Sequence, residues 1–185
     1  METVLATRGD AHFCISQDFQ GIYLCPIVDN LKDKLVNGSW DDYNEAFHCC
    51  RLIHEFRKRP GLQIDFHTMS RGQEYLGLAI MSHGNIDPQL YASSGIHFSE
   101  PLEQVLLFNY FHISPFGRGN GYFWLTNVIM PWYAERGFKA IYMKSSHPKA
   151  FSLYSRLGTV IGEYTAKSDN GVFDRPGRIF RVALQ

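Results

Sequence analysis

The sequence predicts an α/β protein built around one mixed sheet. In the second half of the chain, apolar runs of strand length alternate with helical patterns, and this order is typical of helices packed on a sheet. In the first half, a stripe at three- and four-residue steps from Tyr43 to Arg57 marks an amphipathic helix. The 185 residues suit a single domain, so we expect residues 1–185 to form it.

Composition excludes several classes of protein. Lys and Arg together number 18, as do Asp and Glu, so no overall field attracts nucleic acid or an anionic membrane, and we expect neither partner. The first twenty residues lack the apolar core of a signal peptide, and no stretch reaches the roughly 20 apolar residues that span a bilayer. We therefore expect a soluble cytoplasmic protein. Its four cysteines are expected to be buried thiols, because their spacing suits neither a zinc site nor a disulfide framework.

The first half of the chain contains one clear helix. The apolar run at 21–28 is expected to form the first strand, whereas the residues before it have no clear pattern. Ser39 begins a helix-capping pattern with acids in the first turn. Lys-Arg-Pro-Gly at 58–61 then stops the helix.

A hairpin and a long loop follow. Residues 62–66 alternate and residues 75–81 are apolar, so the two runs are expected to pair around a turn at 70–73. Residues 83–103 hold several Gly, Pro and Ser residues with no periodicity. Loops of that length are often lids over binding sites.

The longest strand candidate is Val105–Ile113. A helical pattern runs from the glycines at 117–121 to Arg136, and Pro131 inside it predicts a kink or a break. Residues 138–144 are expected to form the next strand.

One more helix and two strands complete the prediction. Pro148 suits the first position of a helix that is capped by Ser146 or His147 and ends at Leu157-Gly158. Residues 160–164 and 179–184 are expected to form the last two strands, around a polar loop.

The most informative motif is Gly117-Arg118-Gly119-Asn120-Gly121, which joins the longest strand candidate to a helix. Glycines allow a tight turn and a close approach of the backbone to a ligand. The N–H groups at the following helix start, together with the helix dipole, suit a pyrophosphate. A short glycine cluster is also an ordinary turn, and this motif alone leaves both interpretations open.

A second segment, His147 to Gly158, narrows the choice. Together the two segments resemble the GNAT superfamily of acyl-CoA-dependent N-acyltransferases. The acyl-CoA motif of that family is Q/R-x-x-G-x-G/A, and a later helix carries an N-x-x-A-x-x-L-Y-x-x-L-G-like signature. Gly119 and Gly121 match the first motif, with Phe116 at its usual Arg or Gln, and His147 stands at the usual Asn of the second. The other positions of the second signature are matched by Ala150, Leu153, Tyr154, Leu157 and Gly158.

The resemblance covers about residues 104–165 and implies a fold and a cofactor. The implied fold is a mixed central sheet of about seven strands, splayed near its middle, with helices on both faces. The implied acyl donor is acetyl-CoA, with its pantetheine on the backbone of Phe111 and Ile113 and its pyrophosphate on the N–H groups of the glycine turn, where Arg118 adds charge. The residues expected to bind the cofactor are Phe111, Ile113, Phe116, Gly117, Arg118, Gly119, Asn120, Gly121, Tyr122, His147 and Tyr154.

Acyl transfer to an amine needs a neutral amine near the thioester carbonyl, oxyanion stabilisation and a proton for the departing thiolate. Tyr154 matches the family's usual general acid, because a phenol with a pKa near 10 stays protonated at neutral pH. Sequence alone also allows a packing role for this tyrosine. His112 is the candidate base, because histidine titrates in the useful range. Further candidates are His83, His97, Glu100 and Glu103, and a chain of water molecules is an alternative.

The sequence indicates less about the binding site of the acceptor. Tyr91, Phe98, Tyr110 and Phe111 either shape an acceptor pocket or pack the long loop on the sheet. The predicted function is N-acetyl transfer from acetyl-CoA to a primary amine of a small molecule or a peptide. A catalytically silent acyl-CoA-binding sensor is the alternative. A dinucleotide-binding domain is a further rival, although the sequence lacks a complete G-x-G-x-x-G fingerprint. The oligomeric state stays open, a homodimer included.

Overall fold

The computed structural model describes residues 1–92 and 95–185, and within them eight strands form one mixed sheet in the order β1-β2-β3-β4-β5-β6-β8-β7. Only β5 and β6 pair in parallel, and the other neighbouring strands pair antiparallel. The strands are β1 Thr3–Arg8, β2 Ala11–Ser16, β3 Leu62–Arg71, β4 Glu74–Gly84, β5 Val105–Ile113, β6 Ala140–Ser145, β7 Thr159–Lys167 and β8 Asp174–Ala183. The helices are α1 Cys25–Val36, α2 Glu45–Arg57, α3 Gln89–Ala92, α4 Gly121–Trp124, α5 Met130–Ala134 and α6 Pro148–Leu157. Four further helical segments are described, namely η1 Gly21–Leu24, η2 Leu102–Gln104, η3 Pro115–Gly117 and the π-helical turn η4 Leu125–Ile129.

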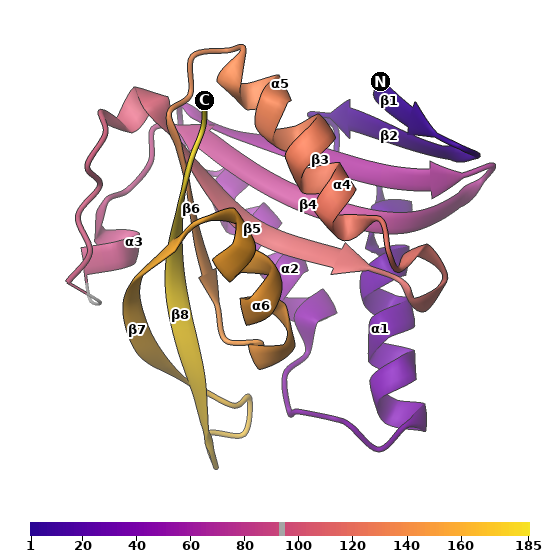
Figure 1. Ribbon diagram of the computed structural model, residues 1–185. Helices are drawn as coiled ribbons and strands as arrows, with labels where there is room; N and C mark the ends of the chain where they lie inside the picture. The colour runs from indigo at the N-terminus through magenta and orange to yellow at the C-terminus, as the bar shows by residue number, and fades with distance from the viewer. Residues whose placement is uncertain (93–94) are drawn as a thin grey trace.

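Helices cover both faces of the sheet (Figure 1). On one face, α6 and the continuous segment from α4 through η4 to α5 pack through buried residues such as Trp124 and Ile129. On the other face, α1 and α2 pack through Ile27 and Ile53 against β3 and β4. The sheet therefore lies between two apolar cores, as the predicted fold class requires.

The N-terminal region differs most from the prediction. Residues 21–28 form η1 and the start of α1 rather than a strand. Pro26 lies in the first turn of α1, where its missing N–H costs no hydrogen bond, and Tyr23 and Ile27, one helical turn apart, are both buried. The patternless first twenty residues contain the hairpin of β1 and β2, which extends the sheet from about seven strands to eight.

Helix α2 begins at Glu45 instead of just after Ser39. Its N-cap is Asn44, whose side chain accepts a hydrogen bond from the Phe47 N–H. Asp42, which looked like a first-turn acid, has a φ of 49° and receives a hydrogen bond from the backbone of the β7–β8 loop instead. A tertiary contact therefore holds the segment before Asn44 outside the helix.

The cysteine prediction is confirmed in part. All four are free thiols; Cys14 and Cys49 are buried, whereas Cys25 and Cys50 are exposed. Since Cys49 and Cys50 are adjacent in α2, only one of them can face the core.

The predicted long loop contains α3 and η2. Tyr91 of α3 is buried against Phe98 and Tyr142, so this part of the segment packs on the sheet. Residues 93 and 94 of the same predicted loop lie outside the described residues.

Several elements match the prediction closely. β5 and α6 have the expected bounds, and β3 and β4 form the expected hairpin around Gly72, whose φ is 57°. Near Pro131 the helix is not broken; the irregularity predicted there is η4, a wider helical turn that ends at Ile129, and Pro131 lies in the first turn of α5. The predicted strand at 138–144 starts later, at Ala140.

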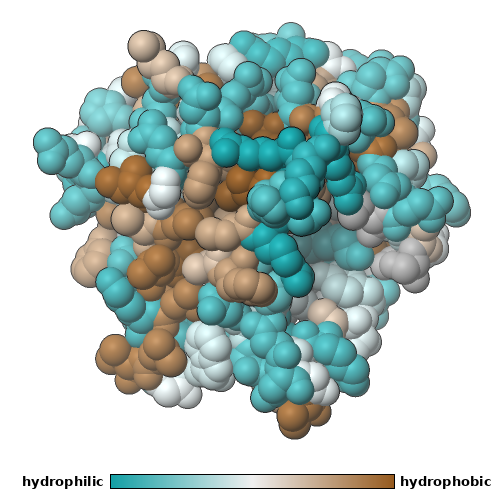
Figure 2. Space-filling view, turned by 180° about the vertical axis from the view of Figure 1, so that it is seen from behind, coloured by the Kyte–Doolittle hydropathy of each residue, from teal (hydrophilic) through white to brown (hydrophobic). Residues whose placement is uncertain are grey.

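The side of the molecule that carries α1 and α2 has exposed hydrophobic residues, among them Leu35 and Val36 at the end of α1. Figure 2 shows this side, where hydrophobic residues gather in patches among hydrophilic ones. In the described part of the chain, none of the helices combines the length and the apolar character needed to span a bilayer.

Candidate active site

The centre of the site is the point where β5 and β6 separate. Their parallel pairing runs from Val105 with Ala140 to Phe108 with Met143 and stops there. Strand β4 continues to pair with β5 as far as Ile113, with a bulge between Phe108 and Tyr110. From Asn109 onward, β5 therefore has one edge without a neighbouring strand, and the two strands diverge as Figure 1 shows.

The direction of the backbone groups on this edge follows from two hydrogen bonds. The N–H of Ser114 donates to the Leu76 carbonyl of β4 at 2.8 Å. The carbonyl of Ile113 instead accepts from the Asn30 side chain of α1 at 3.0 Å. Successive residues of a strand direct their N–H and C=O groups to opposite edges. Phe111 and Ile113 therefore direct theirs away from β4, toward the gap.

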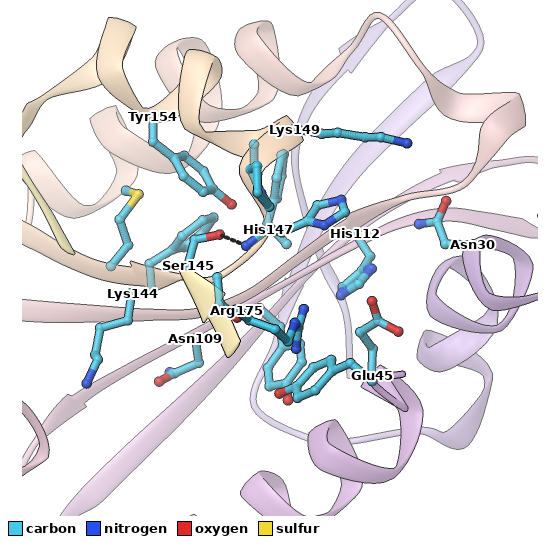
Figure 3. Close-up of a pocket in the computed structure, with 18 of the residues that line it drawn as sticks. Asn30, Glu45, Asn109, His112, Lys144, Ser145, His147, Lys149, Tyr154 and Arg175 are labelled. Atoms are coloured by element: carbon cyan, nitrogen blue, oxygen red, sulfur yellow. Dashed lines mark hydrogen bonds between the residues drawn. The ribbon is translucent and has the colours of Figure 1, made fainter. Parts of the chain in front are cut away.

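A cavity of about 910 Å³ occupies this gap. It is lined from one side by α6, including Tyr154, and from the other by α1 and the segment before α2. Tyr154 belongs to the core on the α4–α5 face, whereas Tyr110 packs with the core on the α1–α2 face. The cavity thus passes between the strands and connects the two sides of the sheet. Figure 3 shows its polar lining, with Tyr154 and His147 across from Glu45 and Arg175.

The glycine turn lies directly after the unpaired edge. Gly119 has a φ of 91°, a conformation that L side chains rarely adopt, and an added Cβ there would meet open space. The first backbone hydrogen bond of the following helix runs from the Trp124 N–H to the Asn120 carbonyl. The N–H groups before Trp124 therefore lie at a helix start, where helices leave donors available to an anion.

In the glycine turn, Gly117 is closely packed and Arg118 is held by a hydrogen bond. At Gly117 an added Cβ would lie 2.7 Å from the Met69 side chain, so this glycine serves packing. Arg118 lines the cavity and donates to Asp33 of α1 at 3.1 Å. Phe116, by contrast, is 75% exposed and lies outside the cavity lining.

Tyr154 projects from α6 into the cavity (Figure 3). Its ring packs against Phe108 and Phe180 and is only 6% exposed. Burial raises the pKa of its hydroxyl well above the ordinary value of a tyrosine. The group is therefore a protonated donor at neutral pH.

Two histidines line the same cavity. Desolvation, assisted by Lys34, lowers the pKa of His112 to about 3, so its imidazole is neutral at pH 7. The pKa of His147 is lowered by the same cause. His147 is the N-cap residue of α6 but gives no side-chain cap; its own N–H donates to Ser145 Oγ at 3.2 Å. His147 therefore occupies the predicted N-cap position of α6, but its side chain does not cap the helix.

A network of four charged side chains lies at the end of the cavity near α2. Lys34 donates to Asp41 at 2.9 Å and also to Glu45, and Arg175 of β8 donates to Asp41 at 3.4 Å. The Arg175 guanidinium lies 4.1 Å from the centre of the Tyr43 ring. The network therefore joins α1, the segment before α2, the first residue of α2, and β8.

Other predicted base candidates lie elsewhere. Glu100 forms an ion pair with Arg181 and accepts from Tyr142, and His83 pairs with Asp65 at 3.1 Å. His97 and Glu103 are exposed and lie outside the cavity lining. Of the aromatic residues proposed for the acceptor side, Tyr91, Tyr110 and Phe111 line the cavity, whereas Phe98 does not.

Sequence reasoning missed the charged network entirely. Lys34, Asp41 and Glu45 lie close together along the chain, but Arg175 is far from them in sequence, and the four residues form no local motif. The acids after Ser39 were the one local sign of a charged site, but the sequence pattern there predicted helix-capping residues instead.

Comparisons with known proteins support the fold. No protein-family model and no curated protein matches the sequence, whereas many solved structures match the fold. A Desulfovibrio desulfuricans protein assigned to the GNAT family aligns over 95% of this chain and 99% of its own, at 13% identity and a TM-score of 0.58. A GNAT superfamily phosphinothricin acetyltransferase from Sinorhizobium meliloti, solved with AcCoA, aligns over 95% and 89%, at 15% identity and a TM-score of 0.56.

A third solved structure aligns with this chain over a similar length. Spermidine N-acetyltransferase from Vibrio cholerae, solved with CoA and spermine, aligns over 93% of this chain and 95% of its own, at 16% identity and a TM-score of 0.54. The sheet that splays between β5 and β6 and these near full-length alignments lead to one conclusion: the chain has the fold of the GNAT superfamily of acetyltransferases.

Proposed function

We propose that the protein is an N-acetyltransferase that transfers the acetyl group of acetyl-CoA to a primary amine by direct attack. The observation that carries this proposal is the unpaired edge of β5, which opens into the cavity and ends at the glycine turn. An extended chain with amide groups can hydrogen-bond to such an edge, and an anion can bind at the helix start after it. Two solved structures with this fold contain AcCoA or CoA, which supports the same donor here.

The donor would be held by residues on both sides of the gap. Acetyl-CoA supplies the activated acetyl group when it is bound. The backbone of Phe111 and Ile113 would hydrogen-bond its pantetheine arm, and the glycine turn, with the charge of Arg118, would bind its pyrophosphate. Of the residues expected to bind the cofactor, Phe111, Ile113, Arg118, His147 and Tyr154 line the cavity. Phe116, Gly117, Gly119, Asn120, Gly121 and Tyr122 lie outside this lining and belong to the proposal only as parts of the turn that would bind the pyrophosphate.

Catalysis would depend on Tyr154 and His112. Because its pKa is raised, the Tyr154 hydroxyl keeps its proton until negative charge develops on the departing sulfur, and then donates it. His112 is a weak base, because its pKa is about 3. We propose that its neutral ring accepts a hydrogen bond from the amine, while water in the cavity carries the released proton to bulk solvent.

The proposal also covers the acceptor and the cellular compartment. The acceptor would be a primary amine of a small molecule or a peptide, bound at the end of the cavity that α1 and the segment before α2 line. The four free thiols, two of them exposed, fit a reducing compartment such as the cytoplasm.

The test has two measurements. Calorimetry on the purified protein should detect binding of CoA and acetyl-CoA, and thiol release from acetyl-CoA should depend on an added amine. No measurable affinity for CoA or its esters would overturn the proposal. Binding without turnover by any amine of a broad panel would favour the acyl-CoA sensor instead.

A further inference from the structure

Two buried charged side chains in the cavity each have one polar atom without a partner. Arg175 is 7% exposed and Glu45 is 8% exposed, and both line the cavity. Among the described residues, neither Arg175 Nη1 nor Glu45 Oε2 has a hydrogen-bond partner. A buried donor or acceptor that stays unsatisfied costs free energy, so nearly all such groups in proteins find a partner. The two atoms therefore indicate a place for a ligand.

The remaining atoms of both side chains are held in position. Arg175 donates through Nη2 to Asp41 at 3.4 Å and stacks on Tyr43, while Glu45 Oε1 accepts from Lys34. In Figure 3 the Arg175 guanidinium and the Glu45 carboxylate both point toward the cavity, on the same side as His112. The open donor and the open acceptor are therefore preorganised, which reduces the entropy lost when a ligand binds.

The two open atoms at this end of the cavity differ in kind. Within the network, the cations Lys34 and Arg175 balance the carboxylates of Asp41 and Glu45. Arg175 Nη1 is an open donor on a cation, and Glu45 Oε2 is an open acceptor on an anion. A diamine would satisfy the acceptor alone, whereas a molecule with a carboxylate and an ammonium group would complement both open atoms.

We infer that the acceptor is a small amine that also carries a carboxylate, as an amino acid does. This inference rests on the proposed transferase function and names its substrate class. Arg175 Nη1 donates to the carboxylate, and Glu45 Oε2 accepts from the amine end, which faces His112. The binding arm of this inference does not require turnover, so it is testable separately from catalysis.

The first test uses the unmodified protein and matched amines. Amino acids and short ω-amino acids are each compared with the carboxamide of the same skeleton and with a diamine of similar length. Because a hydrogen bond to a charged group is replaced by a weaker one, kcat/KM for the best carboxylate should exceed that of its carboxamide by about 10- to 100-fold. Equal values for all carboxylate and carboxamide pairs, or a preference for diamines, would overturn the inference.

The second test assigns the preference to Arg175. Arg175→Met should lower kcat/KM for the carboxylate by about 10- to 100-fold and change that for the carboxamide by less than about 3-fold. Arg175→Lys, which keeps the charge but loses the planar fork, should fall between the two. The matched control is Arg178→Met on the same strand, an exposed arginine paired with Glu163, which should preserve the preference. An equal loss for both amines would assign Arg175 a merely structural role and overturn its part in recognition.

The third test separates this inference from the proposed function. Calorimetry measures binding of each amino acid of the panel and of its carboxamide to the wild-type protein with CoA present, in the absence of an acetyl group. If no amine is acetylated but the carboxylate binds more tightly than its carboxamide, the transferase proposal fails and the recognition of a carboxylate stands. If amines are acetylated but the two ligands bind equally, the transferase proposal stands and the inference fails.

Discussion

The two halves of strand β5 have different surroundings. From Val105 to Phe108, β5 pairs with β4 on one side and β6 on the other, and these residues are at most 5% exposed. From Asn109 to Ile113 it pairs with β4 alone, and its residues are only partly buried. The first half is a closed sheet, and the second half is the wall of a cavity.

The comparison teaches how one strand serves both stability and function. In the closed half, both edges of the backbone are satisfied within the sheet, so nothing is left for a ligand. In the splayed half, the backbone of Phe111 and Ile113 faces a cavity that also holds charged side chains and polar rings. Substitutions in the closed half should therefore affect folding, and those around the splayed half should affect binding and turnover.

The largest expected effect is on turnover. Tyr154→Phe removes the proposed proton donor but keeps the ring that packs on Phe108 and Phe180, so kcat should fall by about 100- to 10,000-fold. Steady-state thiol release across the pH range measures this, and thermal unfolding serves as the control for stability. Equal turnover by the two proteins at every pH would remove Tyr154 from the mechanism.

The next effect concerns the closed half. Leu106→Ala leaves a cavity in the core beside Ile141 and should lower the free energy of unfolding by about 2–5 kcal/mol. Activity per folded molecule should stay near that of the wild type. Denaturant unfolding and an active-site titration measure the two quantities. A loss of turnover without a loss of stability would contradict the division between the two halves.

A smaller effect is expected at the glycine turn. Gly119→Ala places a side chain at a φ of 91° and should cost about 1–2 kcal/mol, through strain or through a changed turn. Because the turn is proposed to bind pyrophosphate, the affinity for CoA should fall by about 10-fold as well. Gly72→Ala is the matched control: its φ is 57°, its Cβ also meets open space, and it lies in the β3–β4 turn, outside the proposed cofactor site. Calorimetry with CoA should show no change for the control.

Per pH unit, the smallest expected effect is the pH dependence of stability. Desolvation lowers the pKa of His67 to about 4, below the ordinary value of 6.5 that applies in the unfolded chain. Between these values the unfolded state binds more protons than the folded state. The free energy of unfolding should therefore fall as pH drops from 6.5 toward 4, by up to about 1 kcal/mol per pH unit for this histidine.

Two variants check the source of this dependence. His67→Gln should reduce the fall in stability below pH 6.5 by the part that comes from this imidazole, whereas His112 and His147, whose pKa values are also lowered, should still contribute. His97→Gln, at an exposed position, should keep the wild-type slope. Urea unfolding at a series of pH values gives both slopes, and an unchanged slope in His67→Gln would contradict the assignment.

The sequence predicted best where local pattern and tertiary packing agree. β5 and α6 have their predicted bounds because a continuous apolar run and a proline-to-glycine span leave little choice of local structure. The prediction was wrong at 21–28, because eight apolar residues suit a strand or a helix equally by pattern. It was also wrong at Ser39, because Asp41 binds Lys34 and Arg175 and Asp42 accepts a hydrogen bond from the β7–β8 loop, so neither acid lies in the first turn of a helix.

What the sequence determined by itself is the strand–glycine turn–helix unit and the Tyr154 helix, since the residues of each lie close together along the chain. Local backbone preferences and side-chain periodicity are sufficient to specify such elements. Only the tertiary structure decided that β5 and β6 part after Phe108 and that Glu45 and Arg175 share one cavity. The reason is physical: a cavity and a buried charge network depend on contacts between distant segments, and local sequence patterns contain no information about such contacts.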